Sequence, residues 1–472
     1  ILTSVYCGCE ATNVMGTANV TMTGGTIGVP RTDTQILAHP VTCNLFGAGK
    51  GDQRVFFNKD TNVNDAVVTV SGGRIYGSVF GGGEDGHIMR NSTVTISGAN
   101  TKIGTKGTSY MDGNVFGGGR GFGGDALTAG NVGGAVTLNI ENGYVLGSVY
   151  GGGRLASVGY GLYLTTETGY GEMRADDVWD DPNKPITSKQ TAAEFFDKGR
   201  GKITINISGG TIGNDVANAE YGGNVFGGSM GSLTKQDGTL NTQWDKFATA
   251  KKTTVNVSGG TIKRSVYGGG ELGTVTTDAV ITVSGGTIGK PKEGTTVYGG
   301  AVYGNIYGGG KGYVDPDGSN YITAGIVKGN TYVTVENSST TVGETTTTTI
   351  PTIYHNIYGG GAYGSVGDFT YDATGMPTAR KANTTGGTTN ITITGGTIGT
   401  DGKENGLIFG SSRGDVDAPG SIQDKLAWVY DTHVTIGTSG HGTTLTTPLI
   451  KGSVYGGGEN GHTFNDTEVI VH

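Results

Sequence analysis

The chain has 472 residues, of which 93 are glycine and only 10 are proline, and its formal net charge is −8. Glycine at about one residue in five without a Gly-X-Y period excludes collagen, and 34% hydrophobic residues in a periodic arrangement argue against disorder. The basic residues are scattered and no apolar run is long enough for a membrane helix, so neither nucleic acid nor membrane insertion is expected.

Two phrases alternate along the chain from its beginning to its end. The first is an aliphatic residue, an aromatic residue and a glycine-rich turn, and it occurs in eleven copies. The aromatic residues of these copies are Tyr6, Phe46, Phe80, Phe116, Tyr150, Phe226, Tyr267, Tyr307, Tyr358, Phe409 and Tyr455. The second phrase resembles Val-Thr-Val-Ser-Gly-Gly-Thr-Ile-Gly and is clearest at 20–28, 68–77, 203–213, 281–289 and 391–399. Such self-similarity is the mark of a repeat protein.

The repeat has the period of β-strands. Residues 68–71 alternate apolar and polar, glycines follow, and residues 75–80 alternate again before the next glycines. The closest copies, Val70 to Ile96 and Val257 to Val283, are separated by 26 residues. A propeller blade needs about 40 to 50 residues, and helical repeats need better helix formers than Gly, Thr and Val.

The pattern therefore predicts an all-β chain that forms one parallel β-solenoid, or β-helix, over residues 1–472. It would have about ten coils of a repeat of about 26 residues, stacked at about 4.8 Å. Val68, Val70, Ile75 and Val79 would point into the core, and Thr69 and Ser71 outward. Glycine would take corner conformations with positive φ. Both ends fall within a repeat, which predicts a fragment or head-to-tail docking into a fibre.

Insertions are expected at two corners of the solenoid. One group follows Thr-Ile-Gly, at 29–43 and 344–355. The other follows the glycine triplets, at 154–200, 229–251, 311–330, 362–387 and 411–431. The largest, 154–200, resembles a separate lobe and contains Trp179 with the acidic residues Asp176, Asp177, Asp180 and Asp181. Paired carboxylates serve acid-base chemistry on glycosidic bonds, and a cation site or a solvated acidic loop are the alternatives.

The eleven aromatic residues form the sharpest candidate site. Alternation with a buried Val79 places Phe80 and its counterparts outside, where stacking would make an apolar ladder. Three interpretations stay open: local packing under corner loops, a lateral assembly seam, and a platform on which glycans stack.

The other reactive residue types form no constellation. The histidines have neither metal-ligand spacing nor a Ser-His-Asp arrangement, so no catalytic residue, metal or cofactor is predicted. Of the three cysteines, Cys7 would lie beside Gly47. That register puts Cys7 roughly 13 Å from Cys43, which disfavours a disulfide between them. Buried or free thiols are the simpler expectation for Cys7, Cys9 and Cys43, and an intermolecular bridge is the alternative.

The phrases Ser258-Gly259-Gly260-Thr261-Ile262 and Ser265-Val266-Tyr267-Gly268-Gly269-Gly270 resemble the glycine-rich repeats of large secreted or surface proteins of gut Bacteroidetes. The arrangement is also similar to the right-handed β-helix of autotransporter passengers and filamentous adhesins. This resemblance implies an exported bacterial protein, extracellular or on the cell surface, that serves in adhesion or matrix building. By the same analogy the solenoid would be right-handed and three-sided.

We therefore expect a structural or adhesive repeat protein, not an enzyme, that assembles with itself head to tail or laterally, or that binds surface glycans or proteins. A polysaccharide lyase or hydrolase with its site in the 154–200 lobe is the alternative. A glycan-binding module without catalysis is the third possibility.

Overall fold

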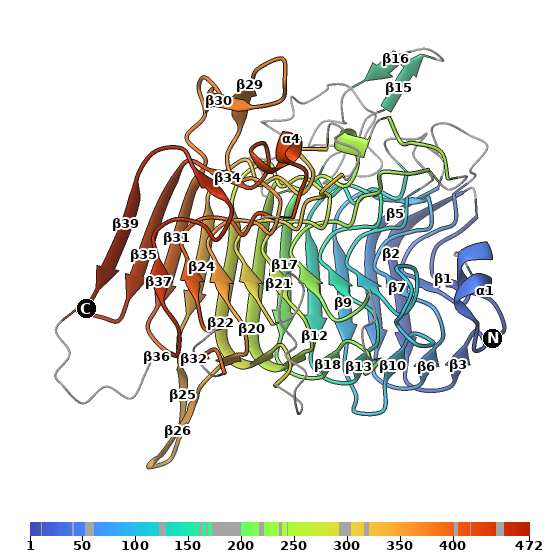
Figure 1. Ribbon diagram of the computed structural model, residues 1–472. Helices are drawn as coiled ribbons and strands as arrows, with labels where there is room; N and C mark the ends of the chain where they lie inside the picture. The colour runs from blue at the N-terminus through green and yellow to red at the C-terminus, as the bar shows by residue number, and fades with distance from the viewer. Residues whose placement is uncertain are drawn as a thin grey trace. The chain divides into compact units, whose positions relative to one another are not determined.

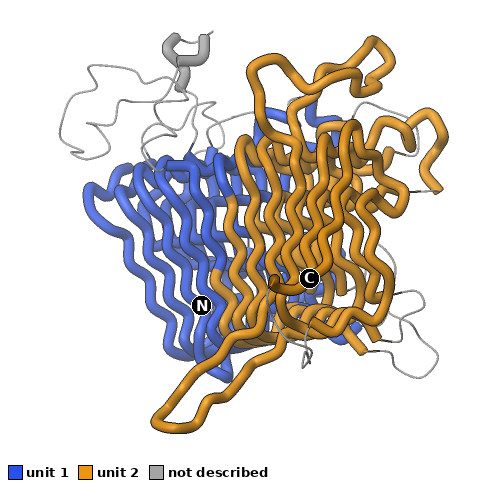
Figure 2. Tube along the Cα trace, turned by 90° about the vertical axis from the view of Figure 1, so that its left-hand side faces the viewer, with its two compact units in different colours: residues 1–205, 213–222, 228–252 blue, residues 206–212, 223–227, 253–472 orange. Residues whose placement is uncertain are grey.

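The computed structural model describes residues 1–10, 12–39, 42–51, 61–121, 129–159, 163–166, 169–171, 200–216, 221–235, 238–242, 244–291, 304–315, 321–400, 405–415, 417–439 and 448–472. The chain divides into two compact units. Unit 1 comprises 1–205, 213–222 and 228–252, and unit 2 comprises 206–212, 223–227 and 253–472 (Figure 2). The prediction of one domain over 1–472 stays a prediction.

The described part of unit 1 contains short strands, which are parallel except for the antiparallel pair β15–β16, one α-helix and one 3-10 helix. The helices are α1 (Asp33–Ala38) and η1 (Trp244–Lys246). The strands are β1 (Val5–Tyr6), β2 (Asn13–Met22), β3 (Thr26–Ile27), β4 (Leu45–Phe46), β5 (Asn62–Val70), β6 (Arg74–Ile75), β7 (Val79–Phe80), β8 (His87–Ile88), β9 (Ser92–Ile96), β10 (Lys102–Ile103), β11 (Val115–Phe116), β12 (Val136–Ile140), β13 (Tyr144–Val145), β14 (Val149–Tyr150), β15 (Tyr163–Thr166) and β16 (Gly169–Gly171). Strand β17 (Lys202–Ile207) has residues in both units.

Unit 2 likewise contains parallel strands together with antiparallel hairpins. Its described helix is α4 (Gly420–Gln423). Strand β20 (Lys252–Ile262) belongs to unit 2 except for its first residue, Lys252, which is in unit 1. Its other strands are β18 (Thr211–Ile212), β19 (Val225–Phe226), β21 (Val266–Tyr267), β22 (Ala279–Ile288), β23 (Ile306–Tyr307), β24 (Thr331–Val335), β25 (Ser338–Val342), β26 (Thr345–Thr349), β27 (Thr352–Ile353), β28 (Ile357–Tyr358), β29 (Phe369–Tyr371), β30 (Pro377–Arg380), β31 (Thr388–Ile393), β32 (Thr397–Ile398), β33 (Ile408–Phe409), β34 (Trp428–Val429), β35 (Asp431–Ile436), β36 (Leu449–Ile450), β37 (Val454–Tyr455), β38 (His462–Thr463) and β39 (Thr467–Val471).

The strands pair in parallel with their equivalents. In unit 1, β2, β5, β9 and β12 lie side by side in that order, and in unit 2 the corresponding series is β20, β22, β24, β31, β35 and β39 (Figure 1). The two-residue strands that carry the aromatic residues pair separately, for example β7 with β11 and β23 with β28. Every aromatic residue lies opposite the next aromatic residue in these pairs.

The apolar side of the alternation forms the core, as predicted. Val68, Val70, Ile75 and Val79 are each 0% exposed, whereas Thr69 and Ser71 are half-buried. An all-β chain is also confirmed, with 40% strand and 3% helix in the described structure.

The prediction of a single β-solenoid with about ten coils of 26 residues is wrong. The described strands fall into several sheets, of which two are large and parallel, with 11 and 20 strands, and four have two strands each. No constant repeat length joins them: equivalent positions are 34 residues apart at Asn44 and Ser78, and 51 residues apart at Asn305 and Asn356. The 26-residue interval reflects two short connections and does not extend along the chain.

The predicted insertions are only partly right. Helix α1, the β29–β30 hairpin and helix α4 lie within predicted insertions, but a third insertion point exists. Thr352 pairs with Thr287, so the β25–β26 hairpin interrupts the second phrase before its Thr-Ile. The predicted insertion began at residue 344 because Thr341-Val342-Gly343 resembles the Thr-Ile-Gly of the second phrase. The observed hairpin begins six residues earlier, at Ser338, and the true Thr-Ile is Thr352-Ile353. The acidic residues of the 154–200 lobe lie outside the described residues.

The glycine triplets have a different cause from the one predicted. Gly286 and Gly396 in the second phrase do have positive φ, of 76° and 88°. The triplet at 308–310 does not. A Cβ on Gly309 would instead lie 2.8 Å from the backbone nitrogen of Gly361 on the neighbouring strand. Close approach of backbones, and not backbone conformation, requires glycine in the triplets.

All three cysteines are free thiols. Cys7 lies beside Gly47, as predicted, because Tyr6 pairs with Phe46 and the Cys7 N–H donates to the Phe46 carbonyl at 3.0 Å. Cys43 is buried and Cys9 donates to the Thr12 carbonyl.

We predict that Gly309→Ala lowers the free energy of unfolding by about 1–3 kcal/mol, because the methyl group overlaps neighbouring backbone. Gly457 holds the same position in its triplet, and an added methyl group there would have no described atom within 4 Å, so Gly457→Ala is the matched control. Urea unfolding of both variants measures the difference. Equal loss in the two would contradict the close-approach explanation.

Candidate functional site

The eleven aromatic residues form a stacked column in each unit. In unit 1 the neighbouring rings from Tyr6 to Tyr150 have centroids 4.7 to 4.8 Å apart, with interplanar angles of 2 to 11°. In unit 2 the rings from Phe226 to Tyr455 are 4.7 to 5.2 Å apart, at 9 to 15°. This spacing equals the distance between hydrogen-bonded strands, so the sheet itself sets the stacking.

The expectation that these rings point outward is wrong. Phe80 is 1% exposed although its neighbour Val79 is also fully buried. Both faces of the two-residue strands are covered, so alternation does not separate core from surface. Tyr6 is half-buried and Tyr455 is 47% exposed. Burial of the other rings is what local packing requires, and a role of this column in assembly or glycan contact stays a prediction.

Tyrosines in the column use their hydroxyl groups inside the protein. The Tyr6 hydroxyl donates to Glu84, and the Tyr358 hydroxyl donates to Glu459 while it accepts a 3.2 Å bond from the Asn356 side chain. Burial is the main cause that raises the pKa of both Tyr6 and Tyr358 far above the usual range of tyrosine, and the neighbouring carboxylate is the second cause. These phenols therefore act as hydrogen-bond donors and not as acids.

A column of serine and asparagine side chains precedes the aromatic column, and the sequence analysis missed it. In unit 1 the Asn44 side chain accepts the Ser78 N–H at 2.7 Å, and Asn114 accepts the Ser148 N–H at 2.8 Å. Asn305 accepts the Asn356 N–H at 3.0 Å in unit 2. The signal was visible: a serine or asparagine stands directly before most of the aliphatic-aromatic pairs.

A third column links the two kinds of strand. In unit 2 the hydroxyl groups of four threonines each donate to a glycine carbonyl after an aromatic residue, always at 2.6 Å. The pairs are Thr253 with Gly268, Thr331 with Gly359, Thr389 with Gly410, and Thr432 with Gly456. Ser92 does the same for Gly117 in unit 1. These four threonines are 0% exposed and so lie on the buried side of the alternation, unlike the half-buried Thr69.

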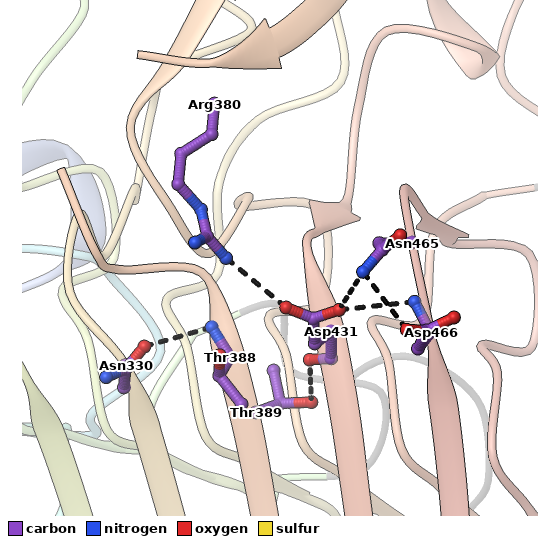
Figure 3. A network of polar contacts seen from close by, with 7 residues as sticks. All are labelled: Asn330, Arg380, Thr388, Thr389, Asp431, Asn465 and Asp466. Carbon is purple, nitrogen blue, oxygen red and sulfur yellow. Dashed lines mark hydrogen bonds and ion pairs between the residues drawn. The ribbon is translucent and has the colours of Figure 1, made fainter. Parts of the chain in front are cut away.

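Acidic and amide side chains at the strand beginnings join neighbouring strands in the same way. The Asn330 side chain accepts the Thr388 N–H at 3.0 Å, and Asp431 accepts the Asp466 N–H at 3.2 Å (Figure 3). Asp431 also accepts from Arg380 at 3.3 Å and from the Asn465 amide at 2.8 Å. Asp431 is thus held by three donors and is a structural anchor.

Charged side chains follow the glycine triplets and form a charge column. In unit 1 it consists of Glu10, Lys50, Glu84, Arg120 and Arg154, and in unit 2 of Glu271, Lys311, Arg413 and Glu459, with the uncharged Ala362 between Lys311 and Arg413. Neighbours of opposite sign pair, as Lys50 does with Glu10 at 3.3 Å and Lys311 with Glu271 at 2.6 Å. Where the signs alternate, as from Glu10 to Arg120, the charges favour the observed register of the strands.

His355 is a buried histidine near Arg413 of this column. Its Nδ1 lies 2.6 Å from the Asn305 side-chain oxygen. Burial, and then the positive charge of Arg413, lower the pKa of His355 to about 4. The ring is therefore neutral at pH 7 and helps to fix the Asn305 side chain.

The metal-ligating side chains of the described residues are dispersed. Among them, no cluster of three histidine, cysteine or acidic side chains is placed to hold a metal ion. Trp179, Asp176, Asp177, Asp180 and Asp181, on which the enzyme alternative depends, lie outside the described residues. Neither α1 nor α4 has the length and apolar composition that a helix needs to cross a membrane.

We predict that Asn114→Ala costs about 1–3 kcal/mol of stability, because it leaves the buried Ser148 N–H without its acceptor. Asn114→Ser should cost less, since serine fills this position at Ser78 and accepts the Asn114 N–H there. Chemical unfolding at pH 7 measures both. A serine variant as unstable as the alanine variant would contradict the column's role.

The pKa of His355 predicts a pH dependence. The folded-state pKa of His355, about 4, lies below the ordinary value of 6.5. The contribution of neutral His355 to the free energy of unfolding is therefore complete above pH 6.5 and is lost as the pH falls toward 4. The loss is on the order of 3 kcal/mol. His355→Gln should remove this part of the pH dependence in urea unfolding between pH 7 and pH 4. An unchanged slope in the variant would exclude His355 as its source.

Comparison of the chain with protein-family models, with curated proteins and with solved structures finds no match. The resemblance to glycine-rich surface repeats stays a prediction.

Proposed function

We propose that the protein is a structural or adhesive module that acts through contacts between copies of itself, outside the cell as the resemblance implies. The observation that carries this proposal is the β25–β26 hairpin, an exposed pair of strands with unprotected edges. The parallel sheets support it, because their repeated side chains are used in bonds between strands and provide a rigid base.

The hairpin projects from the parallel strands of unit 2 (Figures 1 and 2). Its residues from Ser339 to Thr349 are all exposed, and Val342 is 76% exposed. Hydroxyl pairs hold the two strands together, with Ser339 and Thr348 at 3.2 Å and Thr341 and Thr346 at 3.0 Å. At the base, the Ser338 hydroxyl donates to the Ser284 carbonyl at 2.8 Å.

The hairpin lacks the features that protect exposed strand edges. Natural edges carry lysine, proline or a bulge, which block pairing with another strand. Residues 338–349 contain no lysine, arginine or proline, the register of the hairpin is regular, and the one charge is Glu344 at the turn. Threonine and valine also favour strands. Each outer edge therefore offers free backbone groups to an added strand.

A second copy of the same hairpin is the partner that fits best. Pairing of two identical edges about a twofold axis points the two turns in opposite directions, so the Glu344 carboxylates stay apart. It also places threonine beside threonine, as the protein already does between Thr287 and Thr352 and between Thr334 and Thr392. Uncharged strands add no repulsion.

This contact is small. Five residues a strand are far below the roughly 20–30 residues a side of a stable interface, so one hairpin pair gives weak association. Weak contacts become effective when many copies are held near one another, as in a matrix or on a surface. Weak pairing of hairpins therefore suits lateral assembly of many copies.

We predict that self-association of the wild-type chain rises with concentration and is lost in the double variant Thr345→Lys, Thr347→Lys, which leaves the two hydroxyl pairs of the hairpin in place. Both threonines lie on one strand, and lysines there repel their counterparts in a second copy. Sedimentation velocity over increasing protein concentration measures the effect. Stability should change by less than about 0.5 kcal/mol, because the sites are exposed.

The matched control places two lysines at Thr370 and Thr378, which are exposed in the β29–β30 hairpin. That hairpin already contains Arg380 and should not take part, so the control should associate like the wild type. A wild-type chain that stays monomeric at every concentration, or a control that loses association equally, would overturn the proposal.

A further inference from the structure

The charge column of unit 1 contains one residue that breaks its alternation. Glu10, Lys50, Glu84 and Arg120 alternate in sign, but Arg154 repeats the positive charge of Arg120. The two arginines follow the adjacent strands β11 and β14, and they lie side by side, because the Arg154 N–H donates to the Gly119 carbonyl at 3.0 Å and the Leu155 N–H donates to the Arg120 carbonyl at 2.9 Å. On its other side Arg154 faces Met230, whose N–H donates to Gly153. Methionine supplies no charge.

Both guanidinium groups are buried. Arg120 is 1% exposed and Arg154 is 6% exposed. The Nε and Nη1 atoms of Arg154 are buried and have no hydrogen-bond acceptor in the part of the chain that the structure describes. Asp85 and Tyr110 lie near enough to favour its charge but accept no hydrogen bond from these two atoms, and burial together with the charge of Arg120 lowers the pKa of Arg154 to about 10.

The equivalent arginine of unit 2 shows what a completed site looks like. Arg413 follows its glycine-rich turn at the same position and has Glu459 on the next strand. Its Nη1 donates to the Gly414 carbonyl at 3.0 Å, and the neighbouring tyrosines and Glu459 raise its pKa despite burial. Arg154 has the same place in the fold, but Met230 stands where Arg413 has Glu459, and Asp85 acts on Arg154 through its charge without a hydrogen bond to Nε or Nη1.

A buried cation with unused donors is costly, by several kcal/mol, unless a counter-charge joins it. Guanidinium groups bind anions through paired N–H donors, and Nε and Nη offer such a pair. We propose that unit 1 binds a small inorganic anion, with chloride as the simplest representative, at the Nε–H and Nη1–H of Arg154. The enclosed position favours a small ion over a carboxylate carried by a larger molecule.

The test compares the full chain in sodium chloride and in sodium gluconate at constant ionic strength, because gluconate is too large for an enclosed site. The wild-type Tm should be higher in chloride by a few degrees, about 3 °C at ten times the dissociation constant. Arg154→Met should abolish this difference. It should fold, because Met230 occupies the equivalent position on the next strand.

Two further measurements separate binding from a general salt effect. Arg413→Met, the matched control in unit 2, should keep the chloride dependence. Chloride-35 NMR should show a broader line with the wild type than with Arg154→Met at equal protein concentration. Equal Tm in chloride and gluconate for the wild type, or equal line widths for the two proteins, would overturn the proposal.

Discussion

The close approach of glycine backbone on neighbouring strands is the constraint on which the rest of the structure depends. A Cβ on Gly308 would lie 2.1 Å from the Gly359 carbonyl, and one on Gly359 equally near the Gly410 carbonyl. No side chain fits into that space, so glycine is the one residue that permits the turn after each aromatic residue to nest against the next. The 93 glycines are in part a consequence of this nesting.

When the glycine backbones lie this close, side chains at equivalent positions of neighbouring strands are separated by the distance between the strands. Aromatic rings then stack, as Tyr267 does on Tyr307 at 4.7 Å, and amides accept the N–H of the following strand. Threonines such as Thr331 bond the glycine carbonyls and connect the two kinds of strand. The polar residues of the repeat thereby satisfy buried backbone groups. This use leaves the exposed hairpins and loops as the elements free to contact a partner.

Much of the local structure could be predicted from the sequence, and the large-scale arrangement could not. Alternation identified Val68 and Val70 as core residues, and alignment of the repeated phrases identified the paired position of Cys7 and Gly47. It failed at Phe80, because a strand of two residues that is buried on both faces has no solvent side. The repeat length failed because connections of different length join equivalent strands, and pairing is set by side-chain register and not by sequence distance. The candidate chemistry in 154–200 stays outside what the structure describes. The sequence shows that Arg154 repeats the positive charge of Arg120 after the next glycine triplet, but it does not show that Arg154 is buried.

Hydrogen exchange of backbone amides tests the nested strands most directly. The N–H groups of Gly308 and Gly359 donate to the next strand at 2.9 Å, and both residues are buried. Their exchange should require unfolding of the unit, whereas the exposed β25–β26 hairpin should exchange through local opening, orders of magnitude faster. Slow exchange at 306–310 and 357–361 with fast exchange at 338–349 is the expected result. Equally fast exchange in all three segments would contradict the nested parallel strands.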